Sequence, residues 1–138
     1  MQNLVRFGVS LEKDLLARFD KRMRERGHSN RSEAIRDLIR RDFVEDSWEK
    51  DGEVAGAVTL VYDHHRHDLV GQLVHLQHDF QESILSSKHV HLDHDHCLEI
   101  IAVKGRASRV RLLSEQLKGL KGVMHGSLSM GSTGRDLE

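Results

Sequence analysis

The stretch KHVHLDHDHCLEI, residues 88–100, decides the fold of the second half of this chain. Its first six residues, and the segment HCLEIIAVKG that begins at His96, both have the pattern of strands, and the polar residues between them are typical of a tight turn. The stretch therefore predicts a β-hairpin. It also contains four histidines, two aspartates and the only cysteine of the chain, which makes it a candidate metal site.

Elements on both sides of this hairpin complete an alternating pattern. We expect a strand over 53–64, an amphipathic helix over 67–87, a second helix over 106–122 and a final strand over 123–130. The order βαββαβ is typical of a ferredoxin-like α+β domain. We place this domain at 54–131, after a charged linker at 47–53 and before a polar tail at 132–138 that we expect to be disordered.

Residues 1–46 predict a separate strand–helix–helix module. Alternation over VRFGVS (5–10) indicates a short strand, and helices are expected over 11–27 and 30–46. Asn30 and Glu33 have the spacing of a capping box at the start of the second helix. A lone strand has no ladder partner, so we expect a dimer in which two copies pair their strands antiparallel.

The two modules differ in charge. Residues 1–43 carry eleven Lys or Arg and seven Asp or Glu, a net charge of +4, while residues 44–138 carry ten and fifteen, a net charge of −5. Ten of the eleven histidines also lie in the second part. The first module is therefore suited to a polyanion and the second to a cation. Neither a signal peptide nor a membrane-spanning apolar run is evident, so we expect a cytoplasmic protein.

Four residues are candidate metal ligands. His89 and His91 lie two apart on a predicted strand and project from one face, and Cys97 begins the returning strand at the same end of the sheet. In a reducing compartment Cys97 stays free to bind a metal. A helical wheel places His78 roughly 130° from the centre of its apolar face. It then points away from its own core and would reach a hairpin of another subunit.

Three imidazoles and one thiolate disfavour calcium and magnesium and leave nickel, copper, zinc and cobalt. The alternative is a polar strand face that binds no ion. His94 and His96 are expected to be solvated in the turn. For His64, His65 and His67 a weak surface site is possible, but simple exposure is the favoured expectation.

Together these motifs resemble the nickel-responsive transcriptional regulators (NikR), which join a ribbon-helix-helix DNA-binding module to an ACT-like regulatory domain. The resemblance covers about residues 5–130. Its carriers are RFGVSLEKDLL, NRSEAIRDLIR, LVYDHHRHDL, LQHDF and HVHLDHDHCLEI followed by AVKG. It implies a regulator rather than an enzyme, with nickel-dependent repression of nickel-uptake genes.

The resemblance also implies a ligand set. Ni²⁺ would be bound by His89, His91 and Cys97 of one subunit and by His78 of a neighbour, in a homotetramer built as a dimer of dimers. Residues implied to support this site by hydrogen bonds are Glu99, Gln77 and Tyr62. A secondary cation is implied at Glu33 and Asp37, where pairing of each carboxylate with a nearby arginine is the alternative.

The predicted ribbon fits the major groove of double-stranded, palindromic operator DNA. Its outward residues, which would face the bases, are Arg6, Gly8 and Ser10. Phosphates would bind at the start of the second helix, near Ser29, Asn30 and Arg31. Gly8 departs from the family, which usually has a hydroxyl side chain there, so readout at that position is expected to differ.

Two other functions remain open from the sequence. One is a cytosolic metal-storage or delivery protein whose first module only dimerises. The other is a ribbon-helix-helix regulator that senses another metal or a small organic ligand. Substituting Arg6 separates the first alternative from a regulator, because storage does not need that residue. An enzyme is disfavoured, since no nucleophile accompanies a base in a recognisable site.

Overall fold

The computed structural model describes residues 3–138 and divides the chain into two compact units, one ending at Arg40 and the other beginning at Arg41. Helix α2 (Arg31–Glu49) belongs partly to each of them. No helix among residues 3–138 has the length and apolar character needed to cross a membrane.

The first unit contains helix α1 (Lys13–Glu25) and the start of α2. The chain leaves α1 through Gly27, whose φ of +85° suits glycine. At the start of α2, the Asn30 side-chain oxygen accepts a 2.9 Å hydrogen bond from the backbone N–H of Glu33. The Glu33 carboxylate accepts in return from Ser29 rather than from Asn30. The predicted capping box therefore differs in one contact: Glu33 bonds to Ser29, the residue before Asn30.

The strand predicted over 5–10 is not formed in the single chain, where residues 3–12 have no regular secondary structure. A strand needs a hydrogen-bonded neighbour, and this unit has none among its described residues. The alternating residues Val5, Phe7 and Val9 are 84%, 70% and 61% exposed. An apolar row left in solvent in this way is typical of a surface that another chain covers.

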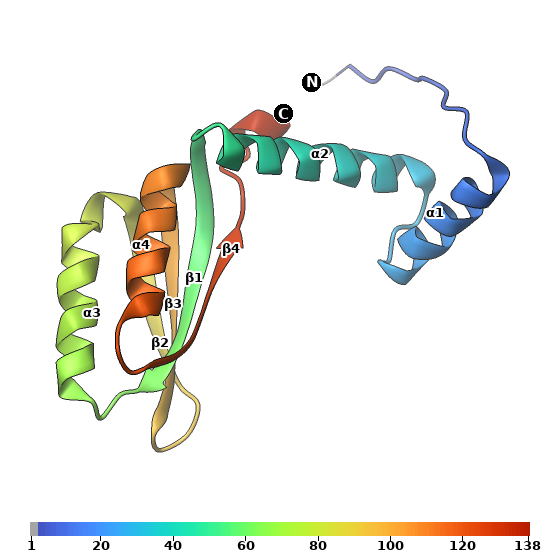
Figure 1. The fold of residues 1–138 in the computed structure, drawn as a ribbon. Helices are drawn as coiled ribbons and strands as arrows, with labels where there is room; N and C mark the ends of the chain where they lie inside the picture. Colours follow the sequence, from blue (N-terminus) through green and yellow to red (C-terminus); the bar gives the residue numbers. More distant parts are fainter. Residues whose placement is uncertain (1–2) are drawn as a thin grey trace. The chain divides into compact units, whose positions relative to one another are not determined.

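The second unit is a four-stranded antiparallel sheet with two helices on one face (Figure 1). The strand order is β2-β3-β1-β4, so the two central strands are β3 and β1. In chain order the elements are β1 (Glu53–Asp63), α3 (His67–Asp79), the short 3-10 helix η1 (Gln81–Ser83), β2 (Ile84–His91), β3 (His96–Arg106), α4 (Ala107–Gly119), β4 (Val123–Met130) and η2 (Arg135–Leu137). The predicted ferredoxin-like βαββαβ order is confirmed.

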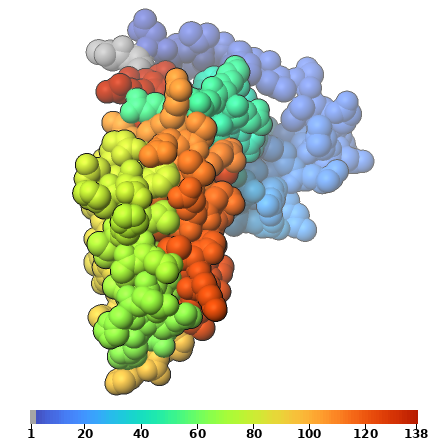
Figure 2. Space-filling model, turned by 60° about the vertical axis from the view of Figure 1, so that its left-hand side comes forward, coloured from blue at the N-terminus to red at the C-terminus, as the bar shows by residue number. Residues whose placement is uncertain are grey.

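Figure 2 shows α3 and α4 side by side over the sheet. Their inner faces pack on apolar residues of the two central strands, among them Val58 and Ile101, which are fully buried. Because these strands alternate buried and more exposed positions, one sheet face supplies the core. This core holds the end of the β2–β3 hairpin in place.

The helix predicted over 67–87 is wrong in its last part. Helix α3 ends at Asp79, Phe80 is buried, and the chain passes through η1 into β2. Residues 84–87 pair with β3 instead of continuing the helix. Ile84 is the first residue of β2 and packs on the core from there. Its position in the sequence also fits the apolar face of a helix that continues α3, which made the longer helix look correct. Ladder hydrogen bonds to β3 outweigh local helix propensity here.

Helix α2 continues to Glu49, into the stretch expected to be a linker. Its Trp48 is only 3% exposed and donates a 2.9 Å hydrogen bond to the Gly131 carbonyl. The tail contains η2, and its Asp136 accepts hydrogen bonds from Ser47 and Ser132. A buried tryptophan therefore attaches the end of α2 to the second unit.

Candidate metal centre

The register of the hairpin gathers the candidate ligands on one face of the sheet. His91 lies opposite Cys97 and His89 opposite Glu99 across the β2–β3 ladder. On the other side of β3, Tyr62 of β1 lies opposite Cys97. Directly opposed residues of an antiparallel pair point to the same face. Cys97, Glu99 and Tyr62 are each 1% exposed, so this is the face that the helices cover.

The thiol and one imidazole already approach each other. Sγ of Cys97 lies 3.7 Å from Nδ1 of His89, whose side chain is 54% exposed. Metal bonds of about 2.3 Å to sulfur and about 2.0 Å to nitrogen place two such ligands roughly 3.1 to 3.6 Å apart. A side-chain movement of a few tenths of an ångström therefore brings both atoms to one ion. The donor chemistry and the spacing fit a borderline transition metal.

Glu99 is a buried carboxylate with three hydrogen-bond donors. Tyr62 Oη donates at 2.7 Å, Gln77 Nε2 at 2.6 Å and Ser87 Oγ at 2.8 Å. A buried carboxylate is costly unless its oxygens are paired in this way. On the outer side, His89 Nε2 lies 3.6 Å from Oε1 of the same residue. Glu99 therefore lies where it can orient the His89 imidazole.

The hydroxyl of Tyr62 contacts both Glu99 and His89. It lies 3.2 Å from His89 Nδ1 while donating to the carboxylate. Burial raises the pKa of Tyr62 above its ordinary value, and the bond to Glu99 raises it further. The phenol therefore keeps its proton at neutral pH and acts as a hydrogen-bond donor.

The other two candidate ligands, His78 and His91, are exposed in the single chain. His78 is exposed near the end of α3, directly after Gln77, which faces Glu99. This agrees with the helical wheel, which directs His78 away from its own core. His91 is also exposed, and its ring packs edge-on against His64 with 4.7 Å between centroids. One chain therefore brings together Cys97 and His89 and leaves His78 on the surface.

Sequence reasoning missed one member of this group, Ser87. It lies two residues before His89 on the same strand face and donates to Glu99. The two-residue periodicity of a strand was the available signal. Assigning residues 84–87 to a helix concealed it.

Comparison with known proteins identifies the family. The model of the NikR C-terminal nickel-binding domain matches residues 55–131, and the model of the copG family of ribbon-helix-helix proteins matches residues 5–42. A protein of Syntrophus aciditrophicus described as a nickel-responsive regulator is 53% identical over 135 residues, which are 98% of each chain. The chain belongs to the NikR family.

Other relatives agree with this assignment. A protein of Chlorobium phaeobacteroides with the same description is 56% identical, covering 96% of this chain and 98% of its own. One from Pyrococcus furiosus is 52% identical, covering 97% and 98%. Among solved structures, an uncharacterised protein from Thermotoga maritima has a TM-score of 0.51 and 20% identity, covering 56% of this chain and 96% of its own. That likeness concerns the fold alone.

The carboxylates that the NikR resemblance assigns to a secondary cation have other contacts in the structure. Glu33 accepts a 2.7 Å hydrogen bond from the Ser29 hydroxyl, which holds the pKa of Glu33 below its usual value. Asp37 lies 3.6 Å from Nε2 of His28. Glu33 thus takes part in a helix cap, whereas pairing with an arginine was the alternative to the cation site.

The positions assigned to DNA in the NikR resemblance fall into two groups. Arg6, Gly8 and Ser10 are exposed in the irregular segment 3–12. At the helix start, Arg31 donates two hydrogen bonds to Asp20, at 3.0 and 2.9 Å. These bonds lower the pKa of Asp20. Arg31 is therefore held by α1, while Ser29 and Asn30 cap α2.

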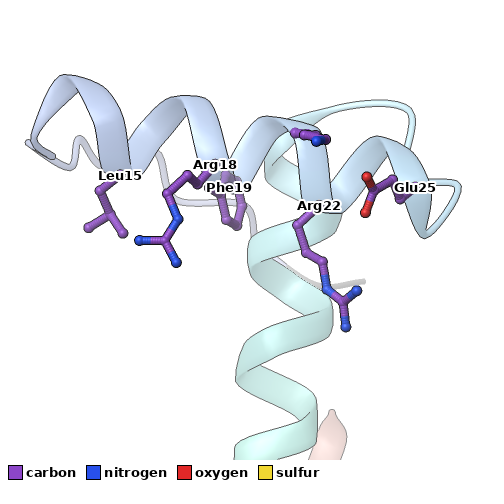
Figure 3. Close-up of a pocket in the computed structure, with 6 residues that line it drawn as sticks. Leu15, Arg18, Phe19, Arg22 and Glu25 are labelled. Atoms are coloured by element: carbon purple, nitrogen blue, oxygen red, sulfur yellow. The ribbon is translucent and has the colours of Figure 1, made fainter.

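An open concavity lies along α1 of this unit. The residues that line it are Leu15, Arg18, Phe19, Lys21, Arg22 and Glu25 (Figure 3). Leu15 is 46% exposed. All six side chains come from one helix, and four of them are charged, so the concavity is part of the open surface of α1 and not an enclosed ligand site.

Proposed function

We propose that this chain represses nickel-uptake genes as a nickel-responsive, DNA-binding regulator of the cytoplasm. Membership of the NikR family supports the class, and the observation that carries the site is the approach of the Cys97 thiol to His89 beside buried Glu99. A ribbon-helix-helix module in the same chain supplies the means of binding DNA. The protein is proposed as a regulator and not as an enzyme.

The proposed nickel ligands are His89, His91 and Cys97 of one subunit and His78 of a neighbour. Cys97 and His89 come from adjacent strands, and His91 lies opposite Cys97 in the ladder. His78 is exposed on α3, where a second subunit can reach it. Bound nickel supplies a link between two subunits. Glu99, with Tyr62 and Gln77, keeps the His89 ring in place.

The proposed assembly is a tetramer built as a dimer of dimers. In the first unit the uncovered residues Val5, Phe7 and Val9 supply a dimer contact. In the second unit His78 supplies the other contact through nickel. An assembly joined in this way lets nickel bias how two DNA-binding dimers are held. If nickel raises the affinity of the protein for the operator by a given factor, thermodynamic linkage requires that the operator raise its affinity for nickel by the same factor.

Operator binding is proposed to use the paired segments 5–10 of two chains in the major groove of a palindromic site. Arg6 is the principal base reader, since arginine binds guanine through two hydrogen bonds. Ser10 can bond either base type, whereas Gly8 has no side chain to do so. Ser29, Asn30 and Arg31 lie near the phosphate backbone. Glu33 and Asp37 remain the proposed secondary cation site.

The first experiment measures operator affinity at fixed salt, with nickel and with chelator. We expect a gain of at least ~10-fold with nickel for the wild type, within the usual range of coupling. Cys97→Ser and His78→Ala should lose this gain. The matched control is His75→Ala, because His75 is an exposed histidine on the same helix. Equal affinity of the wild type with nickel and chelator would falsify the proposed function.

The second experiment tests whether His78 acts across subunits. His78→Ala retains the three hairpin ligands, and Cys97→Ser retains His78. Each variant alone should lack the complete four-ligand site, so each should bind nickel more weakly than the wild type, and Cys97→Ser should also lose the thiolate charge-transfer absorption. Mixing and refolding the two should restore part of the tight nickel binding, because a hybrid interface can contain one intact site. No recovery on mixing, with tetramers present by sedimentation, refutes the shared site.

A further inference from the structure

The end of helix α2 is attached to the second unit by contacts with two distant segments. These segments are the start of α4 and the tail after β4, which meet the end of α2 at the end of the sheet opposite the hairpin turn (Figure 1). We propose that Trp48 and Asp51, the α2 anchor, position α2 so that nickel binding in the second unit changes operator affinity. This inference rests on the proposed function.

Asp51 supplies a cap that α4 does not have of its own. Arg106, the residue before α4, makes no side-chain capping bond. Instead the Ser108 N–H donates a 2.7 Å hydrogen bond to Oδ1 of Asp51. The Ala107 N–H donates a 2.9 Å bond to the Gly52 carbonyl. The first backbone donors of a helix have no partner within it, so the turn after α2 satisfies two of them. The exposed Arg106 side chain lies 3.7 Å from Oδ2 of Asp51, a contact that contributes little.

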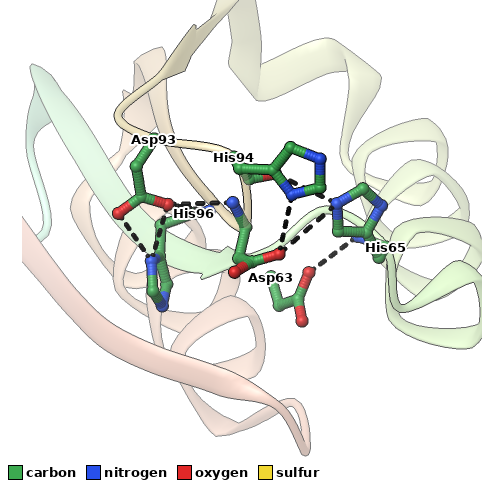
Figure 4. Close-up of polar contacts among 6 residues, drawn as sticks. Asp63, His65, Asp93, His94 and His96 are labelled. Atoms are coloured by element: carbon green, nitrogen blue, oxygen red, sulfur yellow. Dashed lines mark hydrogen bonds and ion pairs between the residues drawn. The ribbon is translucent and has the colours of Figure 1, made fainter.

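A carboxylate in the hairpin turn makes similar bonds within a single segment. Asp93 Oδ1 accepts hydrogen bonds from the N–H of Asp95 at 2.9 Å and of His96 at 2.8 Å (Figure 4). These donors lie two and three positions further along the chain, so the bonds shape one turn. The bond between Asp51 and Ser108 joins segments 57 positions apart. It therefore holds the end of α2 against another element.

The backbone of Asp51 is also unusual. Its φ is +56°, the one positive value at a non-glycine residue among residues 3–138. Aspartate is one of the few residues that enter this left-handed region, and such a conformation persists only where surrounding contacts hold it. The bond from Ser108 lowers the pKa of Asp51, so the carboxylate is ionised at neutral pH. The shape of the turn between α2 and β1 thus depends on its contact with α4.

Trp48 makes the second attachment, from the last turn of α2. Its indole is 3% exposed and donates a 2.9 Å hydrogen bond to the Gly131 carbonyl. Cζ of Arg111 on α4 lies 5.4 Å from the centroid of the indole ring. The Gly131 N–H donates to the Ala55 carbonyl of β1 at 2.9 Å, so the acceptor of the indole bond is itself fixed to the sheet.

Strand β3 connects the proposed nickel site to the α2 anchor. The strand begins at His96, beside the proposed ligand Cys97, and ends at Arg106, directly before α4. Its residues Ile101 and Val103 are fully buried in the close-packed core, which resists deformation. Nickel that joins two such units therefore also fixes the positions of their anchors. With the anchor intact, the direction in which α2 leaves the second unit is set; without it, α2 can change direction while nickel stays bound.

The test compares variants of Asp51 in the full-length protein. Asp51→Gly removes the carboxylate but suits the positive φ, so its effect reports the lost bond and not backbone strain. Asp51→Asn keeps an oxygen acceptor and tolerates the same φ. The matched control is Asp46→Ala, which removes a carboxylate of the same helix whose ion pair is with Lys50, four positions away.

Operator affinity at fixed salt, with nickel and with chelator, gives the gain produced by nickel. Asp51→Gly should reduce this gain by a factor of at least ~3, within the range by which changes remote from both ligands alter coupling. Nickel affinity, and operator affinity in chelator, should equal those of the wild type. Asp51→Asn and Asp46→Ala should keep the full gain. Trp48→Phe, which loses the bond to Gly131, should also reduce it.

Trp48 is the only tryptophan of the chain, so its fluorescence reports the anchor without nickel or DNA. Acrylamide quenching should increase in Asp51→Gly, because a loosened anchor exposes the indole. Circular dichroism checks that each variant is folded.

Three results would overturn the proposal. Asp51→Gly could keep the full nickel gain, its loss of gain could be matched by a loss of nickel affinity, or Asp51→Asn or Asp46→Ala could lose as much. A wild type without any nickel gain contradicts the proposed function and this inference together. A wild type with the gain, and an Asp51→Gly protein that keeps it, contradict the inference alone.

Discussion

The hydroxyl of Tyr62 donates a 2.7 Å hydrogen bond to buried Glu99 and at the same time lies 3.2 Å from Nδ1 of His89. This phenol fixes the exposed imidazole relative to the buried carboxylate. The nearby Cys97 thiol is 3.7 Å from the same nitrogen. The position of His89 before any ion binds therefore depends on a residue of the neighbouring strand β1.

We expect Tyr62→Phe to lower nickel affinity about 10-fold, because the variant loses the contact that places the His89 ring before nickel binds; loss of contacts that support a metal ligand has effects in this range. The charge-transfer band should remain, because all proposed ligands are present. Competition titration with a chelator measures the affinity. Ser87→Ala is the matched control, since it removes another hydroxyl from Glu99 without touching His89. An equal loss in both variants would show that Tyr62 has no specific effect on His89.

We expect Arg6→Ala to weaken specific operator binding by about 1–3 kcal/mol, the usual cost of losing a two-hydrogen-bond contact to guanine. Nickel stoichiometry should not change. Fluorescence anisotropy with operator and with scrambled DNA at one salt concentration measures both affinity and specificity. Arg106→Ala removes an exposed arginine of the second unit as a control. Unchanged operator binding in Arg6→Ala would favour the metal-storage alternative.

The hairpin could be predicted because its two strands have distinct patterns and its turn is polar. The register of the two strands then follows, because the short turn between them places His91 opposite Cys97. The contacts of Glu99 with Gln77 and Tyr62 could not be obtained from spacing, because they join three separate elements. The family resemblance supplied those positions, and the structure brings their side chains together.

Two differences between the sequence patterns and the single-chain structure have clear physical causes. The amphipathic pattern of α3 continues by chance through Ile84, and only pairing with β3 shows that a strand has begun. The segment 5–10 alternates as a strand should, but its hydrogen-bond partner is expected on another chain. The local sequence pattern of a segment shows which secondary structure it favours. Whether that structure forms depends on contacts with residues that are distant in sequence or belong to another chain.

We expect Trp48→Phe to destabilise the protein by about 1 kcal/mol, the usual net worth of one buried hydrogen bond. The Trp48 indole donates to the Gly131 carbonyl, and phenylalanine leaves that acceptor unpaired while keeping most of the apolar contact. Urea unfolding measures the change. Val74→Ala, at a position that is 63% exposed on α3, should have little effect. A Trp48→Phe protein as stable as the wild type would show that this bond does not stabilise the fold.

Asp136 should make folding stability depend on pH in acid. The Ser47 hydroxyl, and then Ser132, hold the pKa of Asp136 below its ordinary value in the folded state. The ionised carboxylate therefore stabilises the fold above the unfolded pKa, about 3.9 for aspartate. That contribution falls as pH drops through the lower folded pKa. Urea unfolding across this range should show the wild type more stable than Asp136→Asn near neutral pH, with the difference vanishing in acid. Glu138→Gln removes another tail carboxylate and is the control; a gap between wild type and Asp136→Asn that does not change with pH contradicts the prediction.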